Sequence, residues 1–242
     1  MTRAKYGWKI AGLIFKTICT VFLIGIFALL AWRIIDSKTT PKEIRRIIPN
    51  EALCEAYNEN GNKLTIFTQS QEPFTRVEDK NYGYFHIGDA IFIDEADQIQ
   101  FTLKYNNSTI EHLVIDHKLP MLPARTEDLY DVSIVVMYDL TPDNKEDNYG
   151  DVEDAVSYKR FFPSDCISAE KTVYNYRKFV FDGIDITKRV LAVYVDIYYK
   201  GAVDYDEEPY GTLLIYDYET KNETYKLTIG DKNSINAWNK EH

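Results

Sequence analysis

Cysteine and histidine are scarce in this sequence, which contains three cysteines and four histidines among 242 residues. So few cysteines exclude a disulfide framework. A single bridge between Cys54 and Cys166 stays open if the domain is exported, because sequence spacing does not show whether two cysteines approach closely. The histidines form no zinc pattern, since His112 and His117 would point to opposite faces of one strand. We therefore assign no zinc ligand.

Motifs of catalysis and of nucleotide binding are missing as well. The chain has no G-x-S-x-G nucleophile motif, no glycine-rich phosphate loop and no dinucleotide fingerprint. Ser164, Asp165 and Cys166 are consecutive, but no base that would activate them can be identified nearby. Carboxylate pairs of the glycosidase type arise by chance in so acidic a chain and specify nothing. We expect the chain not to be an enzyme, and we assign no catalytic or cofactor-binding residue.

Basic residues are few outside the N-terminal part. Of the 28 basic and 38 acidic residues in the chain, residues 1–50 contain nine and two, which leaves 19 and 36 for the rest. A domain this acidic repels phosphate backbones, so nucleic acid is not an expected partner. The basic stretch instead suits the anionic headgroups of a lipid bilayer.

Two acidic segments could supply oxygen ligands. They are residues 143–154 (DNKEDNYGDVED) and 204–208 (DYDEE). The spacing of an EF-hand loop fails because Lys145 stands at the third position. A solvated, solubilising loop explains such segments without a ligand. We assign no metal ligand, and calcium binding at these loops is the alternative.

A long apolar run lies near the N-terminus. Residues 17–32 (TICTVFLIGIFALLAW) carry no charge, and residues 10–15 extend the run beyond Lys16. Together they are long enough to cross roughly 30 Å of hydrocarbon as a helix, with Lys16 reaching toward the interface. Trp8 and Trp32 bracket the run as interfacial aromatic residues do. The pattern predicts one transmembrane helix.

A cleaved signal peptide is the alternative to this anchor. Bulky residues follow Ala28 and Ala31 without an A-x-A cleavage site, which favours an uncleaved helix. The flanking basic residues do not decide the orientation. They are Arg3, Lys5, Lys9 and Lys16 on one side and Arg33, Lys38, Lys42, Arg45 and Arg46 on the other. The short N-terminal tail and the β-rich composition of the rest favour an extracytoplasmic domain on a single-pass protein of the cell membrane.

The basic segment after the apolar run has helical character. Residues 42–48 predict one or two helical turns that end before Pro49. Ile44, Ile47 and Ile48 share one face of such a helix. This face either lies at the level of the lipid headgroups or packs onto the following domain.

Strand signals dominate after residue 51. The clearest hairpin has an alternating strand at residues 98–105, a turn at Asn106 and Asn107, and a return strand at residues 108–115. Residues 172–181 have no cleanly polar face, which predicts a strand that is covered on both sides at one end. Further strands are expected at residues 63–68, 84–87, 90–93, 130–140, 190–199, 212–218 and 225–229.

Eight to ten strands without amphipathic helices between them predict a mainly β fold. We expect an N-terminal transmembrane helix followed by an antiparallel β-sandwich of jelly-roll or immunoglobulin-like type. The expected segments are a short basic tail (1–9), a transmembrane anchor helix (10–35), a basic juxtamembrane stem (36–50), an acidic β-sandwich domain (51–230) and a flexible C-terminal tail (231–242).

Tyrosine is unusually frequent, with 19 residues in the chain. Exposed tyrosine clusters, such as those that Tyr174/Tyr176 and Tyr198/Tyr199 would make, suit sugar stacking or protein recognition. The plainer explanation is that half-buried strands favour tyrosine.

The function that these patterns favour is that of a binding module. The leading hypothesis is a non-enzymatic, membrane-anchored domain that binds another envelope protein or a glycan. The alternatives are a membrane-anchored hydrolase acting on envelope or extracellular polysaccharide, and a structural subunit of a membrane complex.

Overall fold

The fold is seen in a computed structural model, which describes residues 3–69, 85–106, 130–139, 156–171, 174–185, 190–199, 211–217, 223–224 and 226–242. Contacts group the chain into two compact units. The first contains residues 1–40 and 171–173, and the second contains residues 41–170 and 174–242. As the sequence predicts, most of the described elements are strands in antiparallel sheets, and an apolar helix precedes them.

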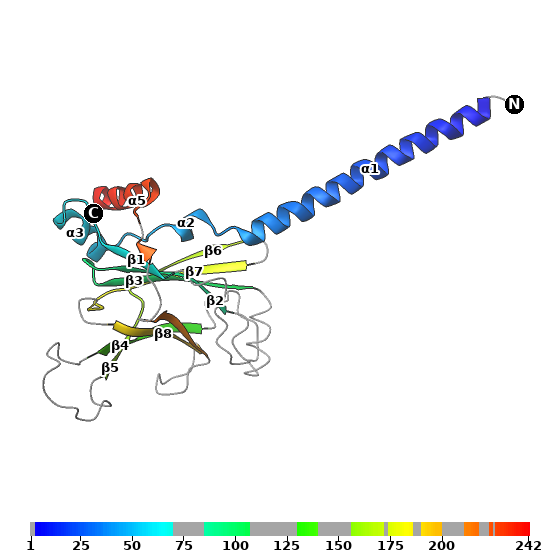
Figure 1. The fold of residues 1–242 in the computed structure, drawn as a ribbon. Helices are drawn as coiled ribbons and strands as arrows, with labels where there is room; N and C mark the ends of the chain where they lie inside the picture. Colours follow the sequence, from blue (N-terminus) through cyan, green and yellow to red (C-terminus); the bar gives the residue numbers. More distant parts are fainter. Residues whose placement is uncertain are drawn as a thin grey trace, which may run out of the picture. The chain divides into compact units, whose positions relative to one another are not determined.

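Helix α1 (Arg3–Lys38) is the main element of the first unit (Figure 1). Its apolar part, Gly12–Asp36, has 25 residues with a mean hydropathy of 2.5, and none of it is buried by protein. At 1.5 Å per residue this part is about 38 Å long, which exceeds the roughly 30 Å of hydrocarbon in a bilayer. The helix is therefore long and apolar enough to cross a membrane, a property that a signal sequence shares.

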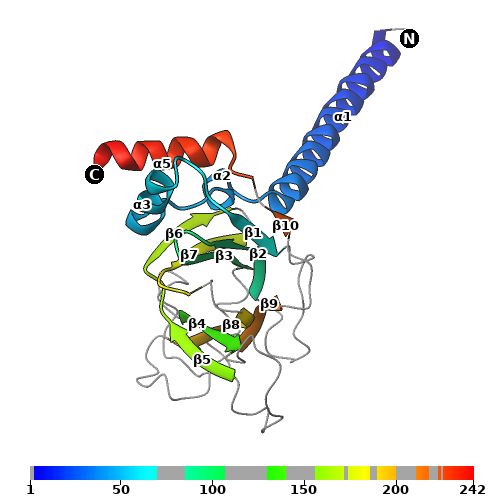
Figure 2. The same cartoon turned by 60° about the vertical axis from the view of Figure 1, so that its left-hand side comes forward.

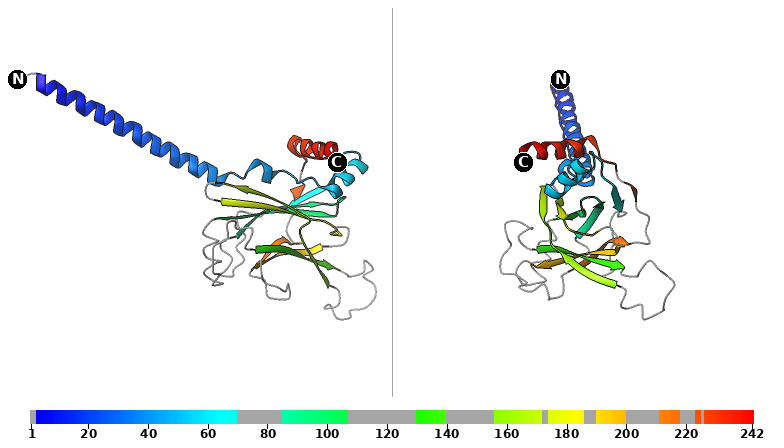
Figure 3. Two further views of the ribbon diagram at one scale, coloured as in Figure 1. Left: turned by 180° about the vertical axis from the view of Figure 1, so that it is seen from behind. Right: turned by 90° about the vertical axis from the view of Figure 1, so that its left-hand side faces the viewer.

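The second unit is built on two antiparallel sheets. One has six strands in the order β10-β1-β2-β3-β7-β6, and the other has four in the order β5-β4-β8-β9. The strands are β1 (Ile66–Gln69), β2 (Phe85–Ile93), β3 (Gln98–Asn106), β4 (Tyr130–Asp139), β5 (Val156–Phe161), β6 (Asp165–Glu170), β7 (Tyr174–Phe181), β8 (Val190–Tyr199), β9 (Gly211–Asp217) and β10 (Glu223–Thr224). Figures 2 and 3 show the two sheets as separate layers that face each other.

Apolar side chains fill the space between the two sheets. Phe101 of β3 stacks on Phe181 of β7, with 5.5 Å between the ring centroids. The ring of Phe85 on β2 meets the edge of Tyr130 on β4 at 5.2 Å, which joins the two layers directly. Aromatic rings in these geometries add to the free energy gained by burying their area. One hydrophobic cluster thus holds both sheets.

Three short helices cover the outer side of the six-stranded sheet (Figure 1). They are α2 (Lys42–Arg45), α3 (Glu51–Glu59) and α5 (Ile229–Glu241). Leu53 of α3 and Ile235 of α5 are fully buried in a second apolar cluster with Ile93 of β2. The predicted two-sided cover of residues 172–181 is confirmed on β7, where Lys178 and Phe179 on opposite faces are each 1% exposed.

Several strands lie where the sequence predicts them. β8 matches the expected range 190–199, and β4 covers all but the last residue of 130–140. The runs at residues 84–87 and 90–93 join into the single strand β2, whose register shifts between Ile87 and Ala90. A bulge there lets one strand continue through Gly88 and Asp89, which lie between the two predicted ranges.

The expected hairpin of residues 98–105 with residues 108–115 is wrong in its pairing. β3 has β2 on one side and β7 on the other, so both of its edges are occupied. The tight turn next to β3 lies before it, between β2 and β3, where Asp97 has a φ of +46°. Residues 108–115 themselves lie outside the described part of the chain.

The flexible tail expected at residues 231–242 is also replaced by regular structure, helix α5. Thr228 and Asp231 form a capping box at its start, in which each side chain binds the other's backbone N–H. Such a box satisfies amides that a helix end leaves free. Helix α3 was not predicted either, although Asn50 caps its N-terminus by accepting a hydrogen bond from the amide of Leu53.

Ile235→Ala tests whether α5 is part of the core. Its side chain is 0% exposed, so we expect its truncation to lower the free energy of unfolding by about 2–4 kcal/mol. Ile229→Ala is the matched control, since that side chain is 80% exposed and its loss should cost less than about 0.5 kcal/mol. Urea unfolding of both variants measures the difference. Equal, small effects would mean that the C-terminal residues do not pack on the sheet.

Candidate functional site

The segment that follows α2 has extended backbone, beginning at Arg46 with φ −83° and ψ 156°. We call residues 46–50 the stem strap. Ile47 and Ile48 of the strap are 1% and 5% exposed, and Ile44 before it is 1% exposed. Of the two positions proposed for this apolar face, packing onto the domain is the one observed. Buried backbone groups of the strap need hydrogen-bond partners, and none of the described strands pairs with the strap.

Gln100 of β3 supplies two of these partners. Its side-chain Oε1 accepts a hydrogen bond from the backbone N–H of Ile48 at 2.9 Å, and its Nε2 donates to the backbone carbonyl of Ile48, also at 2.9 Å. Gln100 is 0% exposed. One amide side chain therefore pairs with the strap as the backbone of an adjacent strand would.

Two further buried side chains hold the strap. The Oδ1 atom of Asp231 on α5 accepts a hydrogen bond from the backbone N–H of Ile47 at 2.9 Å. The ammonium group of Lys178 on β7 donates to the backbone carbonyl of Arg46. Asp231 and Lys178 are 0% and 1% exposed. Burial of such groups is tolerated because each is hydrogen-bonded.

The end of the strap joins the same network. Asn50 donates to Asp182 at 2.9 Å, and its Oδ1 accepts from Gln98 at 2.9 Å. Gln98 also donates to Asp182 at 2.6 Å. Its own oxygen accepts from Gln100 at 2.6 Å. The strap is thus fixed along its length by one connected set of polar side chains, which we call the strap clamp.

A basic pocket of about 380 Å³ lies where the strap meets the start of α5. Its lining consists of Lys42, Arg45, Arg46, Thr228 and Gly230. The sequence shows the three cations as part of a basic stem, but nothing in it places them beside residues near the C-terminus. The strap clamp explains the placement, because Asp231 binds both Ile47 and the capping residue Thr228.

Gly230 allows the guanidinium of Arg46 to lie close to α5. A Cβ atom at Gly230 would be 3.0 Å from Nε of Arg46, a tighter contact than nine in ten real Cβ atoms make. The backbone N–H groups of Ile229 and Gly230 donate to none of the described residues. The first amides of a helix have no partner within it, and they favour a negative charge nearby.

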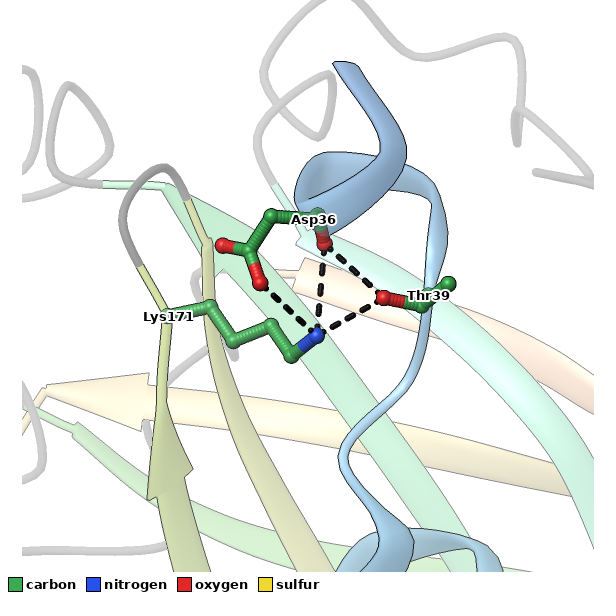
Figure 4. Close-up of polar contacts among 3 residues, drawn as sticks. All are labelled: Asp36, Thr39 and Lys171. Carbon is green, nitrogen blue, oxygen red and sulfur yellow. Dashed lines mark hydrogen bonds and ion pairs between the residues drawn. The ribbon is translucent and has the colours of Figure 1, made fainter. Parts of the chain in front are cut away.

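In the first unit, Lys171 lies against the C-terminal end of α1 (Figure 4). Its Nζ atom is 3.0 Å from Oδ1 of Asp36 and donates to Oγ1 of Thr39 at 2.8 Å. It also reaches the backbone carbonyl of Asp36 at 3.4 Å. A cation at this end of a helix satisfies a free carbonyl and interacts favourably with the helix dipole.

The cysteines are free thiols in this structure. Cys54 packs among the apolar residues of α3, and burial raises its pKa from 9.0 to about 11. Cys166 lies on β6 and packs against the cluster between the sheets. Cys54 and Cys166, between which the sequence left a disulfide open, thus belong to different apolar clusters.

Among the described residues, no catalytic arrangement is formed by the histidines or by the consecutive residues Ser164, Asp165 and Cys166. Burial, with the charge of Lys104, lowers the pKa of His86, so its ring is neutral at pH 7. His242 stacks on Trp238 at 4.2 Å. Asp165 accepts a hydrogen bond from the amide of Cys166, while Ser164 donates to the carbonyl of Val180. His112, His117 and both acidic segments lie outside the described ranges.

The described tyrosines mainly serve the core. Side chains that are at most 5% exposed include Tyr57, Tyr105, Tyr130, Tyr138, Tyr176 and Tyr198. Of the two pairs considered for stacking, Tyr176 and Tyr198 are buried, and Tyr174 is half-buried. Strand propensity and core packing therefore account for most of the tyrosine whose position is known.

A polar cluster on the outer face of the four-stranded sheet was not expected from the sequence. Arg160 of β5 lies 3.0 Å from Oδ2 of Asp196 and donates to Oγ of Ser133 at 2.8 Å. It also donates to the hydroxyl of Tyr198. Burial and the neighbouring Asp196 raise the pKa of Tyr198. Because the Ser133 oxygen accepts from a cation, this arrangement does not activate it as a nucleophile.

Gln100→Leu tests the strap clamp. The variant leaves the N–H and the carbonyl of Ile48 without partners in a buried site, so we expect a loss of about 2–5 kcal/mol in the free energy of unfolding. Thr102→Val is the control, because Thr102 follows Gln100 on the same face of β3 and makes no side-chain hydrogen bond to a described residue. Near-ultraviolet circular dichroism during urea unfolding gives both values. A loss no larger than that of the control would contradict the clamp.

Thiol labelling tests the environment of Cys54. With a pKa of about 11, about one molecule in a thousand carries the thiolate at pH 8. We expect iodoacetamide at that pH to modify Cys166 well before Cys54 in the folded protein. Mass spectrometry of peptides after timed quenching measures the order. In urea the two rates should become similar, and equal rates in the folded protein would contradict the buried position.

The described residues thus provide a clamped basic pocket and an exposed apolar helix, with no group of three or more metal-binding side chains among them. The pocket offers charge and hydrogen-bond donors, which suit recognition of an anion. Comparison with known family models, with curated proteins and with solved structures finds no match to this chain.

Proposed function

We propose that this protein is a single-pass membrane protein whose β-sandwich domain is a non-enzymatic binding module on the extracytoplasmic side. Helix α1 is the anchor, and the domain binds another envelope protein or a glycan. The single observation that carries the proposal is the exposed apolar surface of α1.

Fifteen large apolar side chains of α1, from Leu13 to Ile35, are between 38% and 69% exposed. Removing a side chain of this kind from water contributes about 1.5–3 kcal/mol. The whole set therefore corresponds to roughly 20–45 kcal/mol, which is more than the stability of an ordinary domain. A bilayer provides the apolar surroundings that no described protein surface gives this helix.

Two features support an anchor over a cleaved signal sequence. Helix α1 continues through Trp32 and Arg33 to Lys38 without a break. Ala31 is followed by bulky residues rather than by a small-residue cleavage site.

The order of the strands supports a sandwich of immunoglobulin-like type over a jelly roll. If β2, β3, β4 and β5 are equated with strands A, B, C and C′, then β6 to β9 become D, E, F and G. The sheets then read A-B-E-D and C′-C-F-G, the arrangement found in immunoglobulin-like domains that carry a C′ strand. β1 and β10 extend the first sheet beyond strand A.

The β5 edge of the four-stranded sheet is the surface that we assign to binding. Among the described strands β5 pairs only with β4, and no described strand lies along its other edge. Tyr158 on this strand is 64% exposed, and Phe162 just after it is 49% exposed. Exposed aromatic side chains are enriched at recognition surfaces, and an open strand edge can pair with a partner. Fold likeness alone does not set a function, so the choice of this edge as the binding surface depends on these exposed groups.

Fractionation of cells tests the anchor. We expect full-length, unprocessed protein to stay in the membrane pellet through carbonate washing and to enter solution only with detergent. Replacing Leu23 and Phe27 together by arginine should move most of the protein out of the pellet, because each charge at the centre of a helix adds about 2.5–3.5 kcal/mol to insertion. The same two positions changed to alanine form the control and should leave it in the pellet.

Protease treatment of intact cells tests the topology. Protease added to intact cells should remove the domain and spare the N-terminal segment. Unprocessed wild-type protein in a detergent-free aqueous extract would contradict the anchor, and a domain protected in intact cells would contradict the orientation.

A further inference from the structure

We propose that the basic pocket of Lys42, Arg45, Arg46, Thr228 and Gly230 binds the phosphate of an anionic lipid headgroup. The inference rests on the proposed membrane anchor and assigns a ligand that the anchor alone does not require.

The pocket is positively charged, whereas the domain that contains it is acidic overall. Lys42, Arg45 and Arg46 form no ion pair with any described carboxylate. Beyond residue 50 the chain has 36 acidic and 19 basic residues, so three cations that line one pocket without a described carboxylate partner are not a general feature of this surface. The carboxylate of Asp231 is fully buried and accepts hydrogen bonds from Ile47 and Thr228.

The size and the donors of the pocket fit a phosphate group. Its volume of about 380 Å³ falls in the range of about 300–1,000 Å³ found for small-molecule sites. Two guanidinium groups offer planar pairs of N–H donors, which bind phosphate oxygens in a bidentate manner. The free amides of Ile229 and Gly230 add donors at the start of α5.

The chain itself limits how far the pocket can be from the bilayer. Asp36, the last residue of the apolar part, is six residue steps from Lys42, two of them within the helix and four beyond it. At about 1.5 Å per helical residue and at most about 3.6 Å otherwise, Lys42 is within about 17 Å of Asp36. A lipid headgroup is therefore a nearby and abundant phosphate source, which is why we favour it over a soluble anion.

The strap clamp makes this pocket different from a flexible basic tail. The backbone of Arg46 and Ile47 is fixed by Lys178 and Asp231, and Ile44 between the cations is buried. The three cationic side chains thus start from a fixed backbone. Preorganisation of this kind lowers the entropy lost on binding, so the pocket should select a headgroup and not merely attract negative charge.

Lipid titration of the full-length protein in non-ionic detergent tests the inference. The probes are short-chain phosphatidylglycerol, short-chain phosphatidylcholine and inorganic phosphate, and native mass spectrometry counts the bound molecules. We expect one phosphatidylglycerol per chain, weak phosphatidylcholine binding and only weak competition by phosphate. Changing Arg45 and Arg46 together to glutamine should weaken phosphatidylglycerol binding about tenfold or more, since two charged contacts are lost.

Two further variants distinguish an effect of the pocket on lipid binding from an effect of total charge and from a loss of stability. Lys63→Gln with Lys240→Gln removes the same charge at exposed positions outside the pocket and should leave binding unchanged. Gly230→Ala places a methyl group against Arg46, so phosphatidylglycerol binding should fall several-fold while the urea midpoint is kept, because alanine is tolerated in a helix better than glycine.

Three results would overturn the assignment. They are equal binding of both lipids, equal loss in the two charge variants, and inorganic phosphate that binds as tightly as phosphatidylglycerol. A chain that remains in the carbonate-washed pellet yet shows one of these results contradicts the pocket alone. A chain released by that wash contradicts the anchor instead.

Discussion

Hydrogen bonding between the amide of Gln100 and the backbone of Ile48 is the interaction on which the arrangement of the domain depends. An extended segment that packs on a sheet face without a strand beside it must find partners for its buried backbone. Gln100, Lys178 and Asp231 provide them, and each of these buried side chains in turn gains a hydrogen-bond partner from the strap. The dependence is mutual, so the stretch that follows the apolar helix belongs to the domain and is not a free linker.

The sequence is informative where a structure is determined locally. Alternating and apolar runs predict β8 and β4 almost to the residue, and the apolar run predicts the exposed helix. It is less informative about pairing, since the partners of β3 lie before it and far beyond it along the chain. Helix α5 is mostly polar and contributes one fully buried apolar side chain, Ile235, so its periodicity is weak, although the Thr228–Asp231 capping box is readable.

The candidate site shows the same limit. Gln98 and Gln100 alternate with Ile99 and Phe101, a pattern typical of a solvated face, whereas in the structure both glutamines are buried and bond to the strap. The basic residues of the pocket are visible in the sequence, but Thr228 and Gly230 join them through contacts across most of the chain. The frequent tyrosines, for which strand propensity was the plainer explanation and an exposed stacking surface the alternative, largely serve packing where they are described.

The bond between Ile47 and Asp231 joins residues 184 positions apart, and this separation has a consequence for synthesis. The ribosome makes the strap first, and it makes the carboxylate that fixes the strap 184 residues later. Contacts of such long sequence separation form late and slowly. A chain released before residue 231 would therefore reach the bilayer with the Ile47 amide unpaired and α5 missing, a state that quality-control proteases recognise by its exposed backbone and apolar surface.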